Sequence, residues 1–186
     1  MKFLNRFTIG GATLAGVILA LVFLSSSENL KETATIFNWF SREPSETRER
    51  DGYVTYHHPS YLFSFELSEE YSVSSFEESG GEMIFFQKGA SEASGFQVFI
   101  LPFDEAGPIT AERIKKDVPD MAIESPQQAL LGKDKNLPAL IFFSSHPSLG
   151  KTREVWFIRD GLLYQVTALA ALDGELANIM GTIAFE

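Results

Sequence analysis

The chain has 186 residues, a formal net charge of −10 at pH 7 and no cysteine. Without cysteine there is neither a disulfide bridge nor an attachment point for a lipid anchor, so an exported domain of this sequence must be stabilised by its core alone. The acidic balance, without clusters of lysine and arginine, argues against binding to nucleic acid or to an anionic membrane surface.

An apolar run without a single charge extends from Phe7 to Leu24. A helix over this run would be about 27 Å long, close to the hydrocarbon thickness of a bilayer. Lys2 and Arg6 precede the run, which predicts a cytoplasmic N-terminus and export of the rest of the chain. We therefore predict that residues 1–24 form the transmembrane anchor, or uncleaved signal, of a single-pass cell-membrane protein. The alternative is cleavage after Ser27, which would release a soluble secreted binder.

Residues 25–50 mix polar and charged side chains around one apolar island, which consists of Ile36, Phe37, Trp39 and Phe40. This composition predicts a flexible extracytoplasmic tether between the anchor and a folded domain. The island suits either the membrane interface, where tryptophan and phenylalanine are favoured, or docking on the domain. An unstructured stretch with a few local helical turns is the third alternative.

Residues 51–186 are rich in aromatic side chains and long enough to form one globular domain with a core of its own. Within it, the alternation of apolar and polar residues around Phe65 predicts a strand with Phe63, Phe65 and Leu67 on its buried face. The pair Asp160 and Gly161 tolerates the positive φ angles of a tight two-residue turn and gives the clearest hairpin signal. The predicted hairpins join the following runs: Met83–Gln87 with Phe96–Phe103, and Thr152–Arg159 with Leu162–Ala168.

Two helices are predicted in the same domain. Thr110 can cap a helix over Ala111–Val118, and Asp173 can cap a second helix that runs to Met180. The remaining predicted strands are Ala129–Leu131, Ala139–Ser144 and Thr182–Phe185. Hairpins followed by isolated helices predict an α+β fold, in which an antiparallel β-sheet is flanked by helices.

The order of these elements resembles that of PsbP-like domains, over nearly all of residues 51–186. The resemblance is carried by the following segments: Tyr53–Tyr56, Tyr61–Phe65, Leu131 with Gly132, Leu140–Phe143, the hairpin at Asp160 and Gly161, and Thr182–Phe185. Residues 67–70 depart from the family pattern, which has a proline and a tryptophan there. The resemblance implies the α/β/α sandwich shared by PsbP and Mog1 proteins, used for binding and assembly and not known as an enzyme class.

Candidate chemistry begins with the histidines His57, His58 and His146. Two of them, joined by a carboxylate such as Glu66, could form a metal site if the adjacent pair lies in a loop. Solvated loop histidines are the commoner arrangement, and no metal-binding motif supports the site. We therefore predict no metal-ligating residues.

Other catalytic patterns are missing from the sequence as well. The serines lack a G-x-S-x-G motif, and three carboxylate pairs, Glu69 with Glu70, Glu77 with Glu78 and Asp104 with Glu105, are expected to be solvated. Adjacent aromatic residues such as Phe85 and Phe86 predict a sheet covered by helices on both faces. The alternative is one exposed aromatic face that binds a partner or a glycan strand.

The sequence therefore predicts a membrane-anchored, extracytoplasmic and non-catalytic binding or assembly domain. We expect no catalytic residue, no cofactor and no metal, an envelope protein as partner, and contact with the membrane through the N-terminal helix. The alternative is an envelope hydrolase or metal-dependent enzyme that uses the loop histidines. The oligomeric state is not encoded in any pattern we recognise.

Overall fold

The computed structural model describes residues 52–89, 94–146 and 149–186. The predicted anchor at residues 1–24 and the predicted tether at residues 25–50 lie outside the described residues. Among the residues that the structure does describe, none belongs to a helix long and apolar enough to cross a membrane. The fold and the candidate site are therefore those of the predicted domain.

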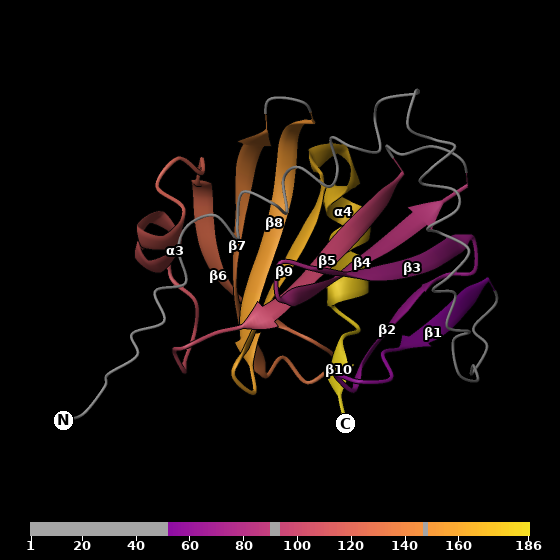
Figure 1. Cartoon of the computed structure of the whole chain (residues 1–186). Coiled ribbons are helices and arrows are strands. Elements are labelled where there is room, and N and C mark those ends of the chain that lie inside the picture. The colour runs from indigo at the N-terminus through magenta and orange to yellow at the C-terminus, as the bar shows by residue number, and fades with distance from the viewer. Residues whose placement is uncertain (1–51, 90–93, 147–148) are drawn as a thin grey trace.

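Two antiparallel sheets dominate the described chain (Figure 1). The large sheet has the strand order β3-β4-β5-β9-β8-β7-β6 and the small sheet the order β1-β2-β10. The strands of the large sheet are β3 (Tyr71–Glu78), β4 (Gly81–Lys88), β5 (Gly95–Pro102), β6 (Glu124–Leu131), β7 (Leu137–His146), β8 (Gly150–Arg159) and β9 (Leu162–Leu169). Those of the small sheet are β1 (Tyr53–His57), β2 (Phe63–Ser68) and β10 (Ala184–Phe185).

The hairpins predicted around the β4–β5 and β8–β9 connections are both present. Asp160 and Gly161 have φ angles of 52° and 76°, as a tight two-residue turn between β8 and β9 requires. Strand β3 is an addition to the prediction. It forms a second hairpin with β4 through Ser79 and Gly80, whose φ angles are 47° and 84°. The serines along β3 weaken its apolar alternation, so periodicity alone does not reveal this edge strand.

Both predicted helices are present. In α3 (Ala111–Asp117) the Thr110 side chain accepts a hydrogen bond from the Arg113 backbone N–H, as a cap should. Helix α4 (Asp173–Met180) follows a short 3₁₀ turn, η1 (Ala170–Leu172). Asp173 is its first residue rather than its cap, and its carboxylate instead pairs with Arg153 at 2.8 Å.

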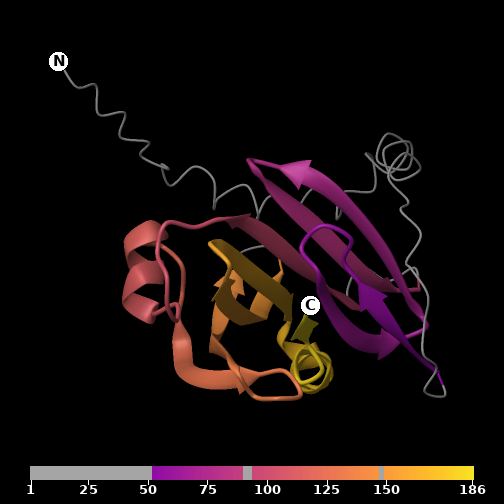
Figure 2. The ribbon, with the colours of Figure 1, turned by 90° about the horizontal axis from the view of Figure 1, so that it is seen from below.

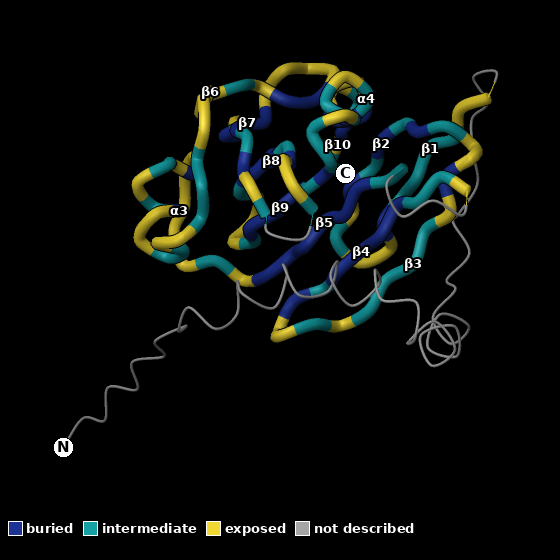
Figure 3. Tube along the Cα trace, turned by 90° about the horizontal axis from the view of Figure 1, so that it is seen from above, coloured by how far each residue is buried: buried dark blue, intermediate teal, exposed yellow. Residues whose placement is uncertain are grey.

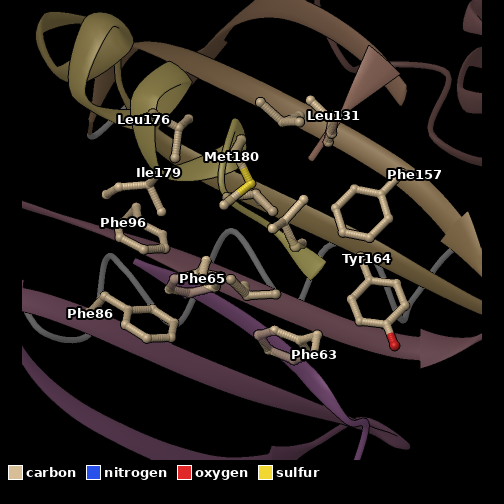
Figure 4. Packing of buried hydrophobic residues seen from close by; sticks show 14 of the residues in the cluster. Phe63, Phe65, Phe86, Phe96, Leu131, Phe157, Tyr164, Leu176, Ile179 and Met180 are labelled. Carbon is tan, nitrogen blue, oxygen red and sulfur yellow. The ribbon is translucent and has the colours of Figure 1, made fainter. Parts of the chain in front are cut away.

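The first face of the large sheet, which carries Phe86, Phe96 and Tyr164, packs against the small sheet and α4. Figure 4 shows Phe63 and Phe65 of β2 and Met180 of α4 meeting these rings. Phe86 stacks on Phe96 with ring centroids 4.5 Å apart. Burying one such side chain contributes about 1.5–3 kcal/mol, so this cluster is the main core.

The second face of the large sheet carries another buried cluster, which includes Met83, Phe85, Phe99, Phe142 and Trp156. From outside the sheet, the described residues that join it lie between Phe103 and Ile123, around α3. Helix α3 lies at the β6 end of the sheet, far from β3 (Figures 1 and 2). Figure 3 shows that buried residues concentrate along β5 and exposed residues along β6.

These layers match the α+β prediction in outline and differ from it in detail. The aromatic residues lie on both faces, as expected, but the first face is covered by the small sheet together with α4. The second face receives one helix of 7 residues from the described chain. The described residues therefore show mostly antiparallel sheet with few helices, and the two helical layers of an α/β/α sandwich are not shown.

Candidate functional site

The three histidines occupy different environments. His57 ends β1 with its Nδ1 3.5 Å from a carboxylate oxygen of Glu186, and His146 ends β7, where burial lowers the pKa of its imidazole. His58 is buried, with only 4% of its surface exposed. The expectation that the loop histidines are solvated is therefore wrong for His58.

His58 has both ring nitrogens engaged. Its Nδ1 accepts hydrogen bonds from the backbone N–H groups of Ser60 and Tyr61, each at 3.2 Å. Its Nε2 lies 3.4 Å from a carboxylate oxygen of Glu82 on β4. The ring also stacks on Phe63, with centroids 5.1 Å apart. His58 thus fixes the loop between β1 and β2 to the large sheet, and neither nitrogen is free to bind a metal ion.

A metal centre receives no support from the described geometry. In residues 52–89, 94–146 and 149–186, no three histidine, aspartate or glutamate side chains are placed to share a metal ion. Glu66, the carboxylate considered for such a site, accepts a hydrogen bond from Lys133 Nζ at 2.7 Å.

The carboxylate pairs are found at turns and strand ends, where the sequence places them. Glu69 and Glu70 are exposed in the turn between β2 and β3. Asp104 and Glu105 have a structural role, because they contact the Arg113 guanidinium at 2.8 and 2.6 Å. This contact lowers the pKa of the Asp104 carboxyl. These groups serve to hold α3 in place.

The group that sequence reasoning missed is a buried carboxylate, Glu154, at the centre of the second face. Thr152 Oγ1 and Thr167 Oγ1 each donate a hydrogen bond to it at 2.7 Å, and Trp156 Nε1 donates a third at 3.3 Å. Its signal in the sequence is the run TREVWFIR, where strand alternation places a glutamate on the same face as Thr152 and Trp156.

Glu154 is an acid without a cationic partner. Burial raises the pKa of its carboxyl, and the three hydrogen bonds oppose that rise. Within the described chain, no lysine, arginine or histidine forms an ion pair with it, so its charge is balanced by hydroxyl and indole donors alone. The described groups that contact the carboxylate are two hydroxyls and an indole N–H, all of which donate hydrogen bonds to it.

Two glutamines extend the polar group across the sheet. Gln97 on β5 pairs in register with Thr167 on β9, which in turn pairs with Glu154 on β8. Gln165 lies on the same face of β9, opposite Trp156 and Phe99. These residues form what we call the polar row: Gln97, Thr152, Glu154, Gln165 and Thr167. It is the candidate functional site.

The polar row is incompletely satisfied. Gln97 and Gln165 are each 2% exposed, and among the residues that the structure describes neither Gln97 Oε1 nor Gln165 Nε2 has a hydrogen-bond partner. Buried polar groups in folded proteins nearly always have partners, so two orphan atoms on adjacent strands mark a place where a partner is required. One is an acceptor and the other a donor.

Comparisons with known proteins bear on the fold. No protein-family model matches the sequence, and no curated protein matches it. The solution structure of cyanobacterial PsbP (CyanoP) from Synechocystis sp. PCC 6803 superposes with a TM-score of 0.54 and 8% identity, covering 77% of this chain and 98% of that protein. A crystal structure from Bacteroides thetaiotaomicron VPI-5482 gives a TM-score of 0.49 at 10% identity, over 71% of this chain and 48% of that one.

The likeness to CyanoP confirms that the domain has a PsbP-like fold. At 8% identity it carries no site residue from that protein to this one. The polar row must therefore be interpreted from its own chemistry.

Proposed function

We propose that this chain is a single-pass membrane protein that displays a non-catalytic PsbP-like binding or assembly domain outside the cytoplasm. The observation that carries the proposal is the use of two buried ionisable residues of the described chain, His58 and Glu154. Each is held by hydrogen-bond partners that fix strands and loops: backbone N–H groups for His58, and the Thr152 and Thr167 hydroxyls for Glu154. The PsbP-like fold agrees with such a role.

The partner in this proposal is an envelope protein. Residues 51–186 carry nine basic and twenty acidic side chains, so electrostatic attraction favours a partner with a basic or neutral surface. Nucleic acid and anionic lipid headgroups are disfavoured by the same charge. An anchor that keeps the domain close to membrane partners raises their local concentration, so a weak site suffices.

The proposed topology is tested with the full chain carrying an epitope after Glu186. The chain should remain in the membrane pellet after alkaline extraction, and protease added outside the cytoplasmic membrane should remove the epitope. N-terminal sequencing should find Met1 or Lys2. A first residue at Glu28 would show release after Ser27, and recovery of the epitope in the cytoplasmic fraction would overturn the proposed location.

A further inference from the structure

The hydrogen-bond partners of His58 determine which protonation state its ring can have in this structure. The backbone N–H groups of Ser60 and Tyr61 both donate to Nδ1, at 3.2 Å each, so this nitrogen carries a lone pair and no proton. The single proton of the neutral ring is then on Nε2, which lies 3.4 Å from a carboxylate oxygen of Glu82. The geometry therefore requires a neutral imidazole that is protonated at Nε2.

A second proton on the ring has to bind at Nδ1, where it opposes the existing contacts. An imidazolium donates from both ring nitrogens and accepts at neither, so the N–H groups of Ser60 and Tyr61 lose their acceptor. The ring of His58 is buried and stacks on Phe63, which prevents it from turning towards water while the loop stays in place. Protonation of His58 therefore disfavours the closed form of the loop between β1 and β2.

The closed loop also contains a strained residue. Leu62 has a φ angle of 54°, a left-handed conformation that side-chain-bearing residues adopt only where their surroundings hold them. The Leu62 N–H donates to the His58 carbonyl oxygen at 3.2 Å, and the His58 N–H donates to the Phe63 carbonyl oxygen at 2.8 Å. Since these bonds close the loop together with the contacts at Nδ1, loss of the Nδ1 contacts allows the strain at Leu62 to favour opening.

The same loop holds the C-terminal strand β10. The Leu62 carbonyl oxygen accepts a hydrogen bond from the Glu186 backbone N–H at 3.0 Å, next to the two residue pairs that β10 forms with the start of β2. Strand β10 has only two residues, so a single bond at its end is a large part of its attachment. Movement of Leu62 therefore loosens β10.

We propose that His58 is a pH-sensitive latch on this part of the domain. With a neutral ring, the loop between β1 and β2 is closed and β10 is held against β2. When Nδ1 binds a proton, the loop opens and β10 is released. Histidine is suited to this role because its ordinary titration range, about pH 6–7, lies near neutrality. The latch goes beyond the proposed function, since it requires neither a membrane nor a partner.

Other ionisable groups of the described chain surround the ring of His58. Glu82 on β4 lies at Nε2, and Glu77 on β3 pairs in register with Glu82, so their negative charges attract a proton to the ring. Tyr56 on β1 and Tyr61 in the loop have ring centroids 6.2 and 4.9 Å from that of His58. Burial, and then the charge of Glu82, raises the pKa of both phenols, so they stay neutral near neutral pH. The two carboxylates thus favour proton uptake, and the two N–H donors couple it to the loop.

His57 acts in the opposite direction. Its Nδ1 lies 3.5 Å from a carboxylate oxygen of Glu186, so a protonated His57 attracts this residue and opposes the release of β10. The response of the loop itself, at Ser60 and Tyr61, is therefore the more direct readout of His58.

Amide hydrogen exchange in the full chain, held in detergent micelles, tests the latch. The protection factor compares each amide with an unstructured peptide at the same pH, which removes the intrinsic pH dependence of exchange. We expect the protection factors of the Ser60 and Tyr61 amides to fall at least about tenfold between about pH 7.5 and about pH 5, with a smaller fall at Glu186.

Two variants assign this response to His58. His58→Asn keeps a side-chain acceptor near the position of Nδ1 and does not titrate in this range, so the protection factors should stay constant. His146→Asn removes a histidine at the end of β7 and should behave like the native protein. Constant protection in the native protein, or an equal fall in native protein and His58→Asn, would overturn the latch.

A second measurement needs no change at residue 58, so it decides the matter even where His58→Asn does not fold. NMR spectra that correlate the ring nitrogens and ring protons of histidine distinguish the two neutral tautomers, with His57→Asn and His146→Asn used to assign the signals. At about pH 7.5, His58 should carry its proton on Nε2. A proton on Nδ1 at this pH would contradict the hydrogen bonds on which the latch depends. Neither measurement tests the proposed binding role, so the latch and that role can fail separately.

Discussion

Replacement of Glu154 tests whether the buried carboxyl of the polar row contributes to the stability of the domain. Glu154→Leu removes the acceptor of the Thr152, Thr167 and Trp156 donors. Each buried donor left unpaired costs about 1–3 kcal/mol, and the two hydroxyls can rotate to seek other acceptors. The variant should therefore lose about 2–4 kcal/mol of unfolding free energy in urea denaturation. Glu154→Gln, which retains an acceptor of the same shape, should lose much less.

The pH dependence of stability gives the sharper readout. Burial raises the pKa of the folded Glu154 carboxyl above its ordinary value of 4.5, so the unfolded state releases this proton first as pH rises. The stabilisation from this group is complete below pH 4.5 and is lost as pH rises towards the folded pKa. Relative to Glu154→Gln, the native protein should thus become less stable with increasing pH. A control, Glu69→Gln at an exposed turn, should follow the native curve. Identical pH curves for the native protein and Glu154→Gln would refute a raised pKa.

Three further predictions concern the structural contacts and the metal alternative. Arg113→Met removes the contacts to three carboxylates that hold α3, so it should cost about 1–2 kcal/mol in urea denaturation, with a smaller loss in 1 M salt. Gly132→Ala should lower the free energy of unfolding by at least about 2 kcal/mol, because φ is +83° and the new Cβ would lie 2.7 Å from the Ile183 carbonyl oxygen. Gly161→Ala should lower it by less in the same assay, because φ is +76° but no atom lies within 4 Å of the new Cβ. Zinc or a chelator should leave the melting temperature of the full chain unchanged, and a zinc-dependent rise would favour the histidine site.

Much of the fold follows from local sequence signals. The alternation around Phe65, the Asp160–Gly161 turn and the Thr110 cap each depend on neighbouring residues, and each predicts its element. Separation of the strands into two sheets depends on pairings between distant segments, such as β2 with β10, which periodicity does not encode. The place of Asp173 has a similar cause. Its carboxylate pairs with Arg153, which is distant in sequence, instead of capping the helix.

The candidate site is harder to predict because its members lie on three strands. Gln97 and Gln165 each stand as one polar residue among mostly apolar neighbours, and Glu154 follows the polar residues Thr152 and Arg153. None of these patterns is a motif. Only the register of β5, β9 and β8 brings them to one face. His58 shows the same limit, since its burial depends on Glu82, 24 positions away in the chain.

The central claim is that the domain binds a specific envelope protein outside the cytoplasm. It is tested most directly by placing a photoreactive amino acid at Tyr53, Leu62 or Leu130, large apolar side chains that are at least 50% exposed, and irradiating intact cells. The account predicts that at least one position yields a crosslink to the same envelope protein in every replicate. Crosslinks to cytoplasmic proteins, or only to a varying background at all three positions, would contradict it.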